Sequence, residues 1–172
     1  MDADREKLKT LLKEKAVKIG EFTLASGKKS NFYIDCRKVT LDPLGAKLIG
    51  KIILEKIKNL NADAVGGLTL GADPIVGAVI TLGGIPGFIV RKREKEHGTK
   101  QKIEGLIELG WKVVIVEDVA TTGSSALQAI QAVESIGATV IKVIAIVDRE
   151  EGAREALRNY DFEPIFKKSD LK

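Results

Sequence analysis

The sequence has very few of the residues that build disulfides and metal cages. Its 172 residues include one cysteine, Cys36, and one histidine, His97. A single cysteine excludes an internal disulfide and a cysteine-based zinc cluster, and a single histidine excludes a three-histidine zinc site. No apolar run reaches the roughly 18 residues of a membrane-spanning helix, and the charged first residues lack the apolar segment of a signal peptide. We therefore expect a cytoplasmic protein with no membrane partner.

A strong charge of one sign and a flexible linker are also absent. Lysine and arginine number 28 against 24 acidic residues, so the net charge is +4. This small surplus suits an anionic small ligand but is too weak to indicate nucleic acid, and we expect no nucleic-acid partner. No repeat or Pro/Ser-rich stretch divides the chain, whose length is close to that of one typical domain. We expect a single domain.

Most of the chain alternates between predicted strands and predicted helices. Continuous apolar, β-branched runs are typical of parallel strands buried on both faces, and they occur at residues 64–68, 87–90, 112–116 and 140–147. Apolar residues at helical spacing predict three helices. The first begins at Pro43, the second runs from Asp73 to about Leu82, and the third contains Leu127 to Ile136 and is ended by Gly137. This pattern predicts an α/β fold with right-handed crossovers.

The first forty residues have a different pattern. Apolar residues at helical spacing predict a helix from Leu8 to Ile19, with Gly20 ending it. Two strand-like segments, 21–24 and 31–35, flank the turn-forming residues 26–29 and predict a hairpin.

One candidate site follows the strand at 112–116. Ligands of open α/β sheets bind beyond the carboxyl ends of the strands. Here Glu117 and Asp118 precede a segment rich in hydroxyls and glycine, residues 119–125, and then a helix. Such a turn offers phosphate both hydrogen-bond donors and a favourable helix dipole, and the carboxylates suit sugar hydroxyls or a shared metal. The alternative is a simple helix cap. Neither a Walker loop nor a Gly-x-Gly-x-x-Gly motif is present.

A second candidate site is the polar segment 91–102. It contains six lysines and arginines, a glycine and no apolar residue. Its position after a predicted strand favours a loop that closes over a polyphosphate, whereas the alternative is a solvated run of charges. With no second histidine in the chain, His97 fits a phosphate or leaving-group contact better than a metal site.

These motifs carry a family resemblance. Residues 113–125 resemble the phosphoribosyl-pyrophosphate (PRPP) motif of type I phosphoribosyltransferases. Residues 20–30, the loop 91–98 and residues 147–149 resemble orotate phosphoribosyltransferases, and order and spacing agree from about residue 17 to 166. The resemblance implies one phosphoribosyltransferase domain over residues 1–172. Its fold would be a central, mostly parallel sheet flanked by helices, with residues 1–40 forming an N-terminal helix and a small hood hairpin.

The resemblance also implies roles for individual residues. The catalytic residues would be Lys92, Lys95, His97 and Asp118. The PRPP-binding residues would be Arg91, Lys92, Lys95, His97, Glu117, Asp118, Val119, Ala120, Thr121, Thr122, Gly123, Ser124 and Ser125. Orotate would be held by Thr121, Arg149 and Tyr33. Mg²⁺ would be held mainly by substrate oxygens, with no direct protein ligand, and the basic loop would be shared across a homodimer.

Some positions depart from the family pattern or fit simpler roles. Some relatives carry lysines where this chain has Ala25 and Gly71, which would leave more of the pyrophosphate contact to the basic loop. Cys36 and Trp111 fit packing roles. Arg37 and Lys38 lie near the predicted hairpin and could contact substrate, although solvated charges are the simpler interpretation.

Three functions remain open at this point. Orotate phosphoribosyltransferase activity is the first, and transfer to another base, such as a purine, is the second. A regulator that senses PRPP or bases and binds DNA is the third, but one helix in residues 1–20 is too little for a helix-turn-helix.

Overall fold

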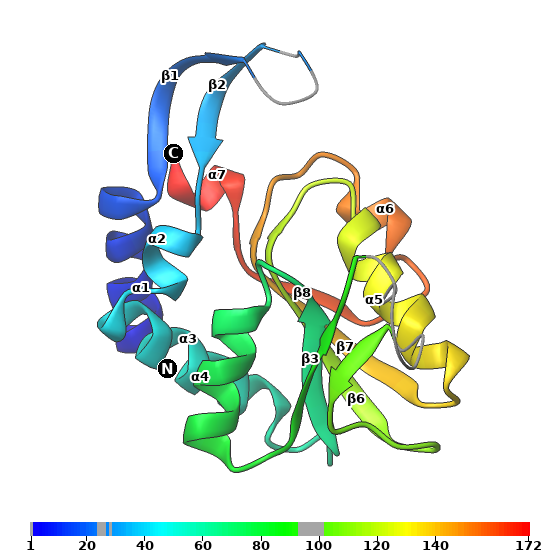
Figure 1. Ribbon diagram of the computed structural model, residues 1–172. Coiled ribbons are helices and arrows are strands. Elements are labelled where there is room, and N and C mark those ends of the chain that lie inside the picture. The colour runs from blue at the N-terminus through cyan, green and yellow to red at the C-terminus, as the bar shows by residue number, and fades with distance from the viewer. Residues whose placement is uncertain (1, 24–26, 28, 93–101) are drawn as a thin grey trace.

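The computed structural model describes residues 2–23, 27, 29–92 and 102–172, and its centre is a six-stranded sheet (Figure 1). The strand order is β5-β4-β3-β6-β7-β8. Five strands run parallel: β3 (Ala64–Leu68), β4 (Gly87–Val90), β6 (Lys112–Ala120), β7 (Thr139–Asp148) and β8 (Phe162–Lys167). The short β5 (Ile103–Gly105) is antiparallel to β4 at one edge. The predicted α/β fold with a mostly parallel sheet is confirmed.

Helices cover both faces of this sheet. One core contains Val114 and Val116 of β6 and packs against α1 (Asp2–Lys15), α3 (Pro43–Ile57) and α4 (Asp73–Gly83). The other core contains Val113 and Ile115 and packs against α5 (Ser124–Ser135). Because side chains alternate along a strand, a run apolar at every position must be buried on both faces. The remaining helices are the short segments α2 (Arg37–Thr40), α6 (Ala153–Ala156) and α7 (Lys168–Leu171).

The N-terminal helix ends earlier than the sequence predicts. It ends at Lys15, and Val17 to Ile19 belong to β1 (Val17–Thr23), which pairs antiparallel with β2 (Lys29–Ile34). The helix prediction was wrong here because Val17 and Ile19 fit a strand's two-residue period as well as a helical one. Gly20 lies at the irregularity between Ile19 and Phe22, not at a helix end. The hairpin itself is confirmed, and it projects from the body of the molecule (Figure 1).

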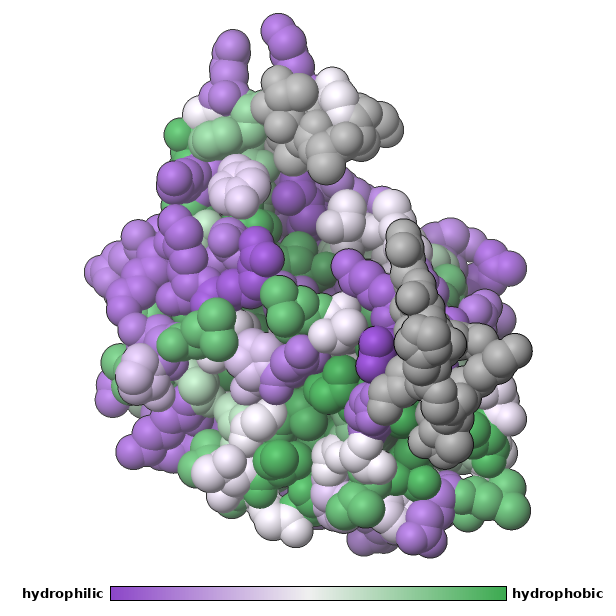
Figure 2. All heavy atoms as spheres, in the orientation of Figure 1, coloured by the Kyte–Doolittle hydropathy of each residue, from purple (hydrophilic) through white to green (hydrophobic). Residues whose placement is uncertain are grey.

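Helix α1 is amphipathic, as the apolar spacing of its sequence predicts. The outward side of α1 is hydrophilic (Figure 2), whereas Leu8, Leu11 and Leu12 are buried beneath it.

The sequence analysis did not predict β8, which contains Pro164. Proline cannot donate to a ladder and is tolerated at a sheet edge, where β8 lies. Within the described ranges, no helix is both long enough and apolar enough to cross a membrane.

Candidate active site

A cavity of about 350 Å³ lies at the carboxyl-end side of the sheet. Five segments line it: the chain after β2, the loop after β3, Lys92, the end of β6 with the following turn, and Arg149. The lining residues predicted from the sequence are Lys92, Glu117, Asp118, Val119, Thr121, Ser125 and Arg149. Residues distant in the sequence therefore converge at the strand ends, as the rule for open α/β sheets predicts.

The carboxylate pair of the cavity lies inside a strand. The sequence analysis placed Glu117 and Asp118 after the strand, but β6 continues to Ala120, where it pairs with Asp148 of β7. Burial and the charge of Asp118 raise the pKa of Glu117 from 4.5 to about 7, although a hydrogen bond with Ser125 lowers it in part. The Oε2 atom of Glu117 is buried and has no hydrogen-bond partner among the described residues. Burial also raises the pKa of Asp118.

The hydroxyl-rich turn leads directly into α5. Gly123 is the N-cap residue and has a left-handed φ of 81°, which a residue with a side chain rarely adopts. No side-chain cap bond forms at this helix end. The hydroxyls of Thr122 and Ser124 lie 3.3 Å apart, and both residues are exposed. Because the N-cap residue is a glycine, no hydroxyl of the turn occupies the capping position, which argues against the simple-cap alternative.

The loop after β3 approaches Asp118 closely at Gly71. A Cβ atom on Gly71 would lie 2.4 Å from Oδ1 of Asp118, which is too close for any side chain. A lysine at position 71 would therefore displace the carboxylate of Asp118. The observed position of this carboxylate thus requires glycine at position 71. Nearby, the Thr69 hydroxyl donates a 2.8 Å hydrogen bond to Asp73. The other position where relatives differ, Ala25, lies outside the described residues.

The sequence analysis gave the segment after β2 too little weight. Asp35, Cys36 and Arg37 line the cavity, although Arg37 was interpreted as a solvated charge rather than as a substrate contact. Its Nε atom lies 2.8 Å from Oδ1 of Asp35, and this hydrogen bond lowers the pKa of Asp35. Cys36 is a fully buried core residue, as its packing role predicts, and burial raises the pKa of its thiol. A pair of opposite charges directly after a hairpin strand was the available signal for this segment.

Arg149 is the one cavity-lining cation that is nearly fully buried, within the part of the chain the structure describes. It lies directly after β7, is 6% exposed and donates its backbone N–H to Ala120 at 2.9 Å. Its guanidinium group lies 6.0 Å from the ring centre of Phe32 in β2. Tyr33, the neighbouring hairpin residue, does not line the cavity and lies instead against Phe22. Its predicted contact with the base stays a prediction.

The remaining predicted residues lie outside the cavity lining or outside the described chain. Arg91 borders an adjacent cavity of about 430 Å³ and pairs with Glu104 at 3.3 Å. Ala120 and Gly123 are buried, and Trp111 packs against a core, as its structural role predicts. Lys95 and His97 are not among the described residues. The described part of the chain holds no group of three or more His, Cys, Asp or Glu residues arranged for a metal ion.

Comparisons with known proteins identify similar chains. The family described as phosphoribosyl transferase domain matches residues 39–166. The chain is 47% identical to an orotate phosphoribosyltransferase of Aquifex aeolicus, over 98% of this chain and 97% of that protein. It is 50% identical to one of Methanocaldococcus jannaschii, over 94% and 92%. A crystal structure of a Mycobacterium tuberculosis orotate phosphoribosyltransferase in complex with PRPP superposes with a TM-score of 0.84, at 37% identity and 98% coverage of both chains.

Proposed function

This chain belongs to the orotate phosphoribosyltransferases, enzymes of the type I phosphoribosyltransferase fold, and we propose that it transfers ribose 5-phosphate from PRPP to orotate with Mg²⁺. The products are orotidine 5′-phosphate and pyrophosphate, in cytoplasmic pyrimidine synthesis. The observation that carries the proposal is the partly buried carboxylate pair, Glu117 and Asp118, which faces a cavity beside the hydroxyl-rich turn 121–125. The M. tuberculosis relative, solved with PRPP, supports the choice of donor.

The reaction separates two charges, and the cavity has groups for each. The bond from the ribose anomeric carbon to pyrophosphate oxygen breaks, a bond to an orotate ring nitrogen forms, and the proton on that nitrogen is released to solvent. Positive charge develops on the ribose, where Glu117 and Asp118 stabilise it and hold the sugar hydroxyls. Negative charge leaves with pyrophosphate, where Lys92 and the other basic residues of segment 91–102 stabilise it. The turn 121–125 holds the 5-phosphate at the N-terminus of α5 and fixes the sugar between these groups.

Mg²⁺ fits the donor set of this site. The cavity offers carboxylate oxygens, the hard ligands that Mg²⁺ prefers, and one of them, Oε2 of Glu117, is buried without a partner among the described residues. Mg²⁺ is commonly bound through one or two carboxylates together with substrate phosphates and water. Here the ribose and pyrophosphate oxygens would be its main ligands, as the family resemblance implies, and Glu117 and Asp118 would lie beside it. When bound, the ion neutralises charge on the leaving pyrophosphate.

Arg149 gives the site its preference for an acidic base. Orotate carries a carboxylate, and a guanidinium group can bind a carboxylate through two parallel hydrogen bonds. The low exposure of Arg149, 6%, strengthens such a pair, because the surroundings screen charge less than water does. Thr121 lies on the same cavity and would hold the ring from the turn side. A neutral purine has no carboxylate to bind this buried cation.

A direct assay tests the choice of base. Pyrophosphate release is measured from PRPP and Mg²⁺ with orotate, hypoxanthine, adenine and uracil offered separately. We expect release with orotate alone, and we expect Arg149→Ala to abolish it. Turnover of a purine, or an Arg149→Ala variant as active as the wild type, would contradict the assignment of the base. PRPP binding with no turnover of any base would indicate a regulator instead.

We further propose a homodimer whose basic loop acts in the partner's active site. Lys92 also lies on the rim of its own cavity, so an arrangement within one chain is the competing hypothesis. Mixing Lys92→Ala with Asp118→Asn under conditions that exchange subunits separates the two. A shared site gives each mixed dimer one intact site, so we expect recovery of about a quarter of wild-type activity from a random one-to-one mixture. A mixture as inactive as its parents would show that the loop acts within its own chain.

A further inference from the structure

Two cations converge on one carboxylate behind the cavity. The guanidinium of Arg149 reaches Oε1 of Glu151 with Nε at 3.2 Å and Nη2 at 3.1 Å. Lys168, the first residue of α7, places its Nζ atom 3.3 Å from the same oxygen. Burial raises the pKa of Glu151, but the hydrogen bonds and charges of Arg149 and Lys168 outweigh burial, so its pKa lies below the usual value. Glu151 is therefore ionised at neutral pH.

The same two cations also share an aromatic ring. Phe32 of β2 is 1% exposed, and its ring centre lies 6.0 Å from Cζ of Arg149 and 5.5 Å from Nζ of Lys168. The C-terminal segment is tied to the loop after β7 by a second contact, because Glu150 accepts hydrogen bonds from the backbone and hydroxyl of Ser169 at 3.1 and 3.3 Å. Figure 1 shows α7 beside β2. Three segments distant in sequence thus meet around Arg149.

We propose that Glu151 and Lys168 are positioning residues for recognition of the orotate carboxylate by Arg149. Glu151 accepts a hydrogen bond from Nε of the guanidinium and lies within ion-pair distance of Nη2, which orients the arginine. Lys168 offsets the charge of Glu151, so the cluster of Arg149, Glu151 and Lys168 keeps a net charge of +1 for an anionic ligand. This inference rests on the proposed function, since it assigns the carboxylate to Arg149.

The role of Lys168 follows from the charge balance. Without Lys168, Arg149 and Glu151 form a neutral pair, and an incoming carboxylate must compete with Glu151 for the guanidinium. The side chain of Arg149 is 7% exposed and that of Lys168 is 19% exposed, whereas that of Glu151 is 34% exposed. Screening is therefore weakest at the guanidinium, where the competition lowers affinity for an acidic ligand. PRPP binds through the turn 121–125 and the carboxylate pair of β6, and its affinity does not depend on this cluster.

The test compares single and double variants in steady-state kinetics. We expect Lys168→Met to raise KM for orotate roughly three- to thirtyfold, which lies within the range of coupling between neighbouring residues, with KM for PRPP within twofold of wild type. Lys168→Arg keeps the charge and should restore most of the affinity for orotate. Lys167→Met is the matched control, because Lys167 is exposed and adjacent, and its loss removes the same charge from the same segment. It should leave both KM values unchanged.

A double-variant cycle decides whether Lys168 acts through Glu151. In a Glu151→Gln background, Lys168→Met should change KM for orotate by less than twofold, because the charge it offsets is gone. An equal loss in both backgrounds, or no loss in either, would overturn the proposal. Thermal unfolding of each variant separates these effects from a loss of folding, which would not move KM for orotate alone.

Failure of the proposed function gives a different result. A wild type that does not use orotate, or an Arg149→Ala variant that binds it normally, would refute both ideas. Normal use of orotate that depends on Arg149 but not on Lys168 would refute only this one.

Discussion

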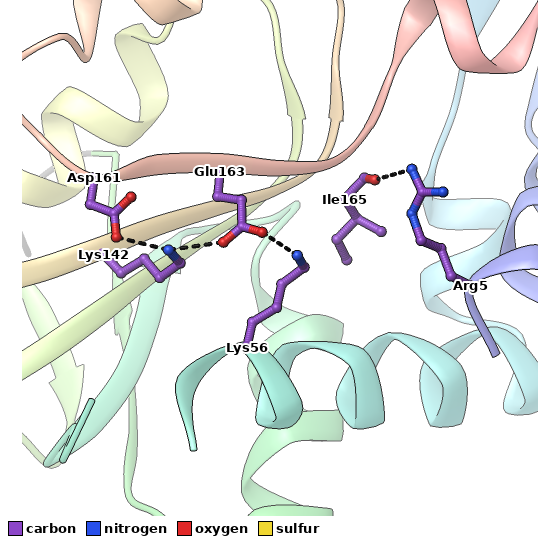
Figure 3. A network of polar contacts seen from close by, with 6 residues as sticks. All are labelled: Arg5, Lys56, Lys142, Asp161, Glu163 and Ile165. Carbon is purple, nitrogen blue, oxygen red and sulfur yellow. Dashed lines mark hydrogen bonds and ion pairs between the residues drawn. The ribbon is translucent and has the colours of Figure 1, made fainter. Parts of the chain in front are cut away.

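Two pairs of carboxylates at opposite ends of the sheet have opposite electrostatic environments. Near the amino ends of β7 and β8, Lys142 lies 2.8 Å from Asp161 and 2.9 Å from Glu163, and Lys56 also pairs with Glu163 (Figure 3). Burial raises the pKa of Glu163, but the hydrogen bonds and charges of the two lysines outweigh it and lower that pKa. At the cavity, burial raises the pKa of both Glu117 and Asp118.

The difference distinguishes a structural network from a binding site. Lys142 and Lys56 neutralise the far pair within the chain, so it contributes to folding without any ligand. The pair in β6 keeps a buried oxygen of Glu117 without a partner in the described chain, which costs free energy that a ligand can recover. Acidic residues therefore stabilise the fold where lysines pair with them, and are available to bind a ligand where no cation in the described chain forms an ion pair with them.

The largest effect should come from neutralising Asp118. We expect Asp118→Asn to lower kcat by about 10²–10³, the typical cost of losing one group that stabilises developing charge. We expect the free energy of unfolding to stay equal or rise, because the variant removes a partly buried charge whose pKa burial has raised. Steady-state assays and thermal unfolding measure the two quantities.

Asp161→Asn is the matched control for that prediction. It makes the same chemical change in the other carboxylate pair, at an exposed residue far from the cavity. Its kcat should stay within twofold of wild type. If both variants lose activity alike, the distinction between the two ends of the sheet fails.

The next largest effect is a pH dependence of stability that arises from Glu117. Its pKa is about 7 in the folded protein against a usual 4.5, so between these values the folded state holds a proton that the unfolded state has released. Stability therefore falls as pH rises from 4.5 to 7, by roughly 3 kcal/mol if the whole shift is realised. Glu117→Gln removes this term, so the variant should gain stability relative to wild type over that window, measured by calorimetry at several pH values.

Glu163→Gln should change stability in the opposite direction to Glu117→Gln. Because the folded pKa of Glu163 is lowered, its contribution is present above its usual value of 4.5 and is lost as pH falls through the folded pKa. The variant should therefore be less stable than wild type at pH 7, with the difference shrinking in acid. The same sign in both variants would contradict the comparison of the two pairs.

The sequence predicted those parts of the molecule that depend on local pattern. The strands at 64–68 and 87–90 have the predicted bounds, because short continuous apolar runs are typical of parallel strands that are buried on both faces. Glu117, Thr121 and Arg149 meet at one cavity as predicted, because strand ends in such a sheet share an edge. The family resemblance, rather than the local pattern, supplied their individual roles.

The missed features depend on packing between distant segments. The alternation of β2 places either Phe32 or Tyr33 toward Arg149, and only the docking of the hairpin on the sheet decides that it is Phe32. Lys168 comes near Arg149 because the chain returns through β8 to the hairpin side, which no local pattern shows. Arg37 lines the cavity because the segment after β2 packs beside the strand ends, which is again a contact between distant parts of the chain.

The smallest effect concerns the structural network itself. The side chain of Lys142 is only 10% exposed, whereas those of its partners Asp161 and Glu163 are 59% and 40% exposed. Lys142→Met leaves Glu163 paired with Lys56 and Asp161 in water, so the loss should fall below that of a fully buried pair, at about 1–2 kcal/mol. Denaturant unfolding at pH 7 measures it, and Lys47→Met, at an exposed position of α3, is the control. Because neither lysine lines the cavity, kcat and both KM values should match wild type in each variant. A Lys142→Met protein that stays as stable as the control but loses activity would mean that this network serves the reaction, and the two ends of the sheet would no longer differ in kind.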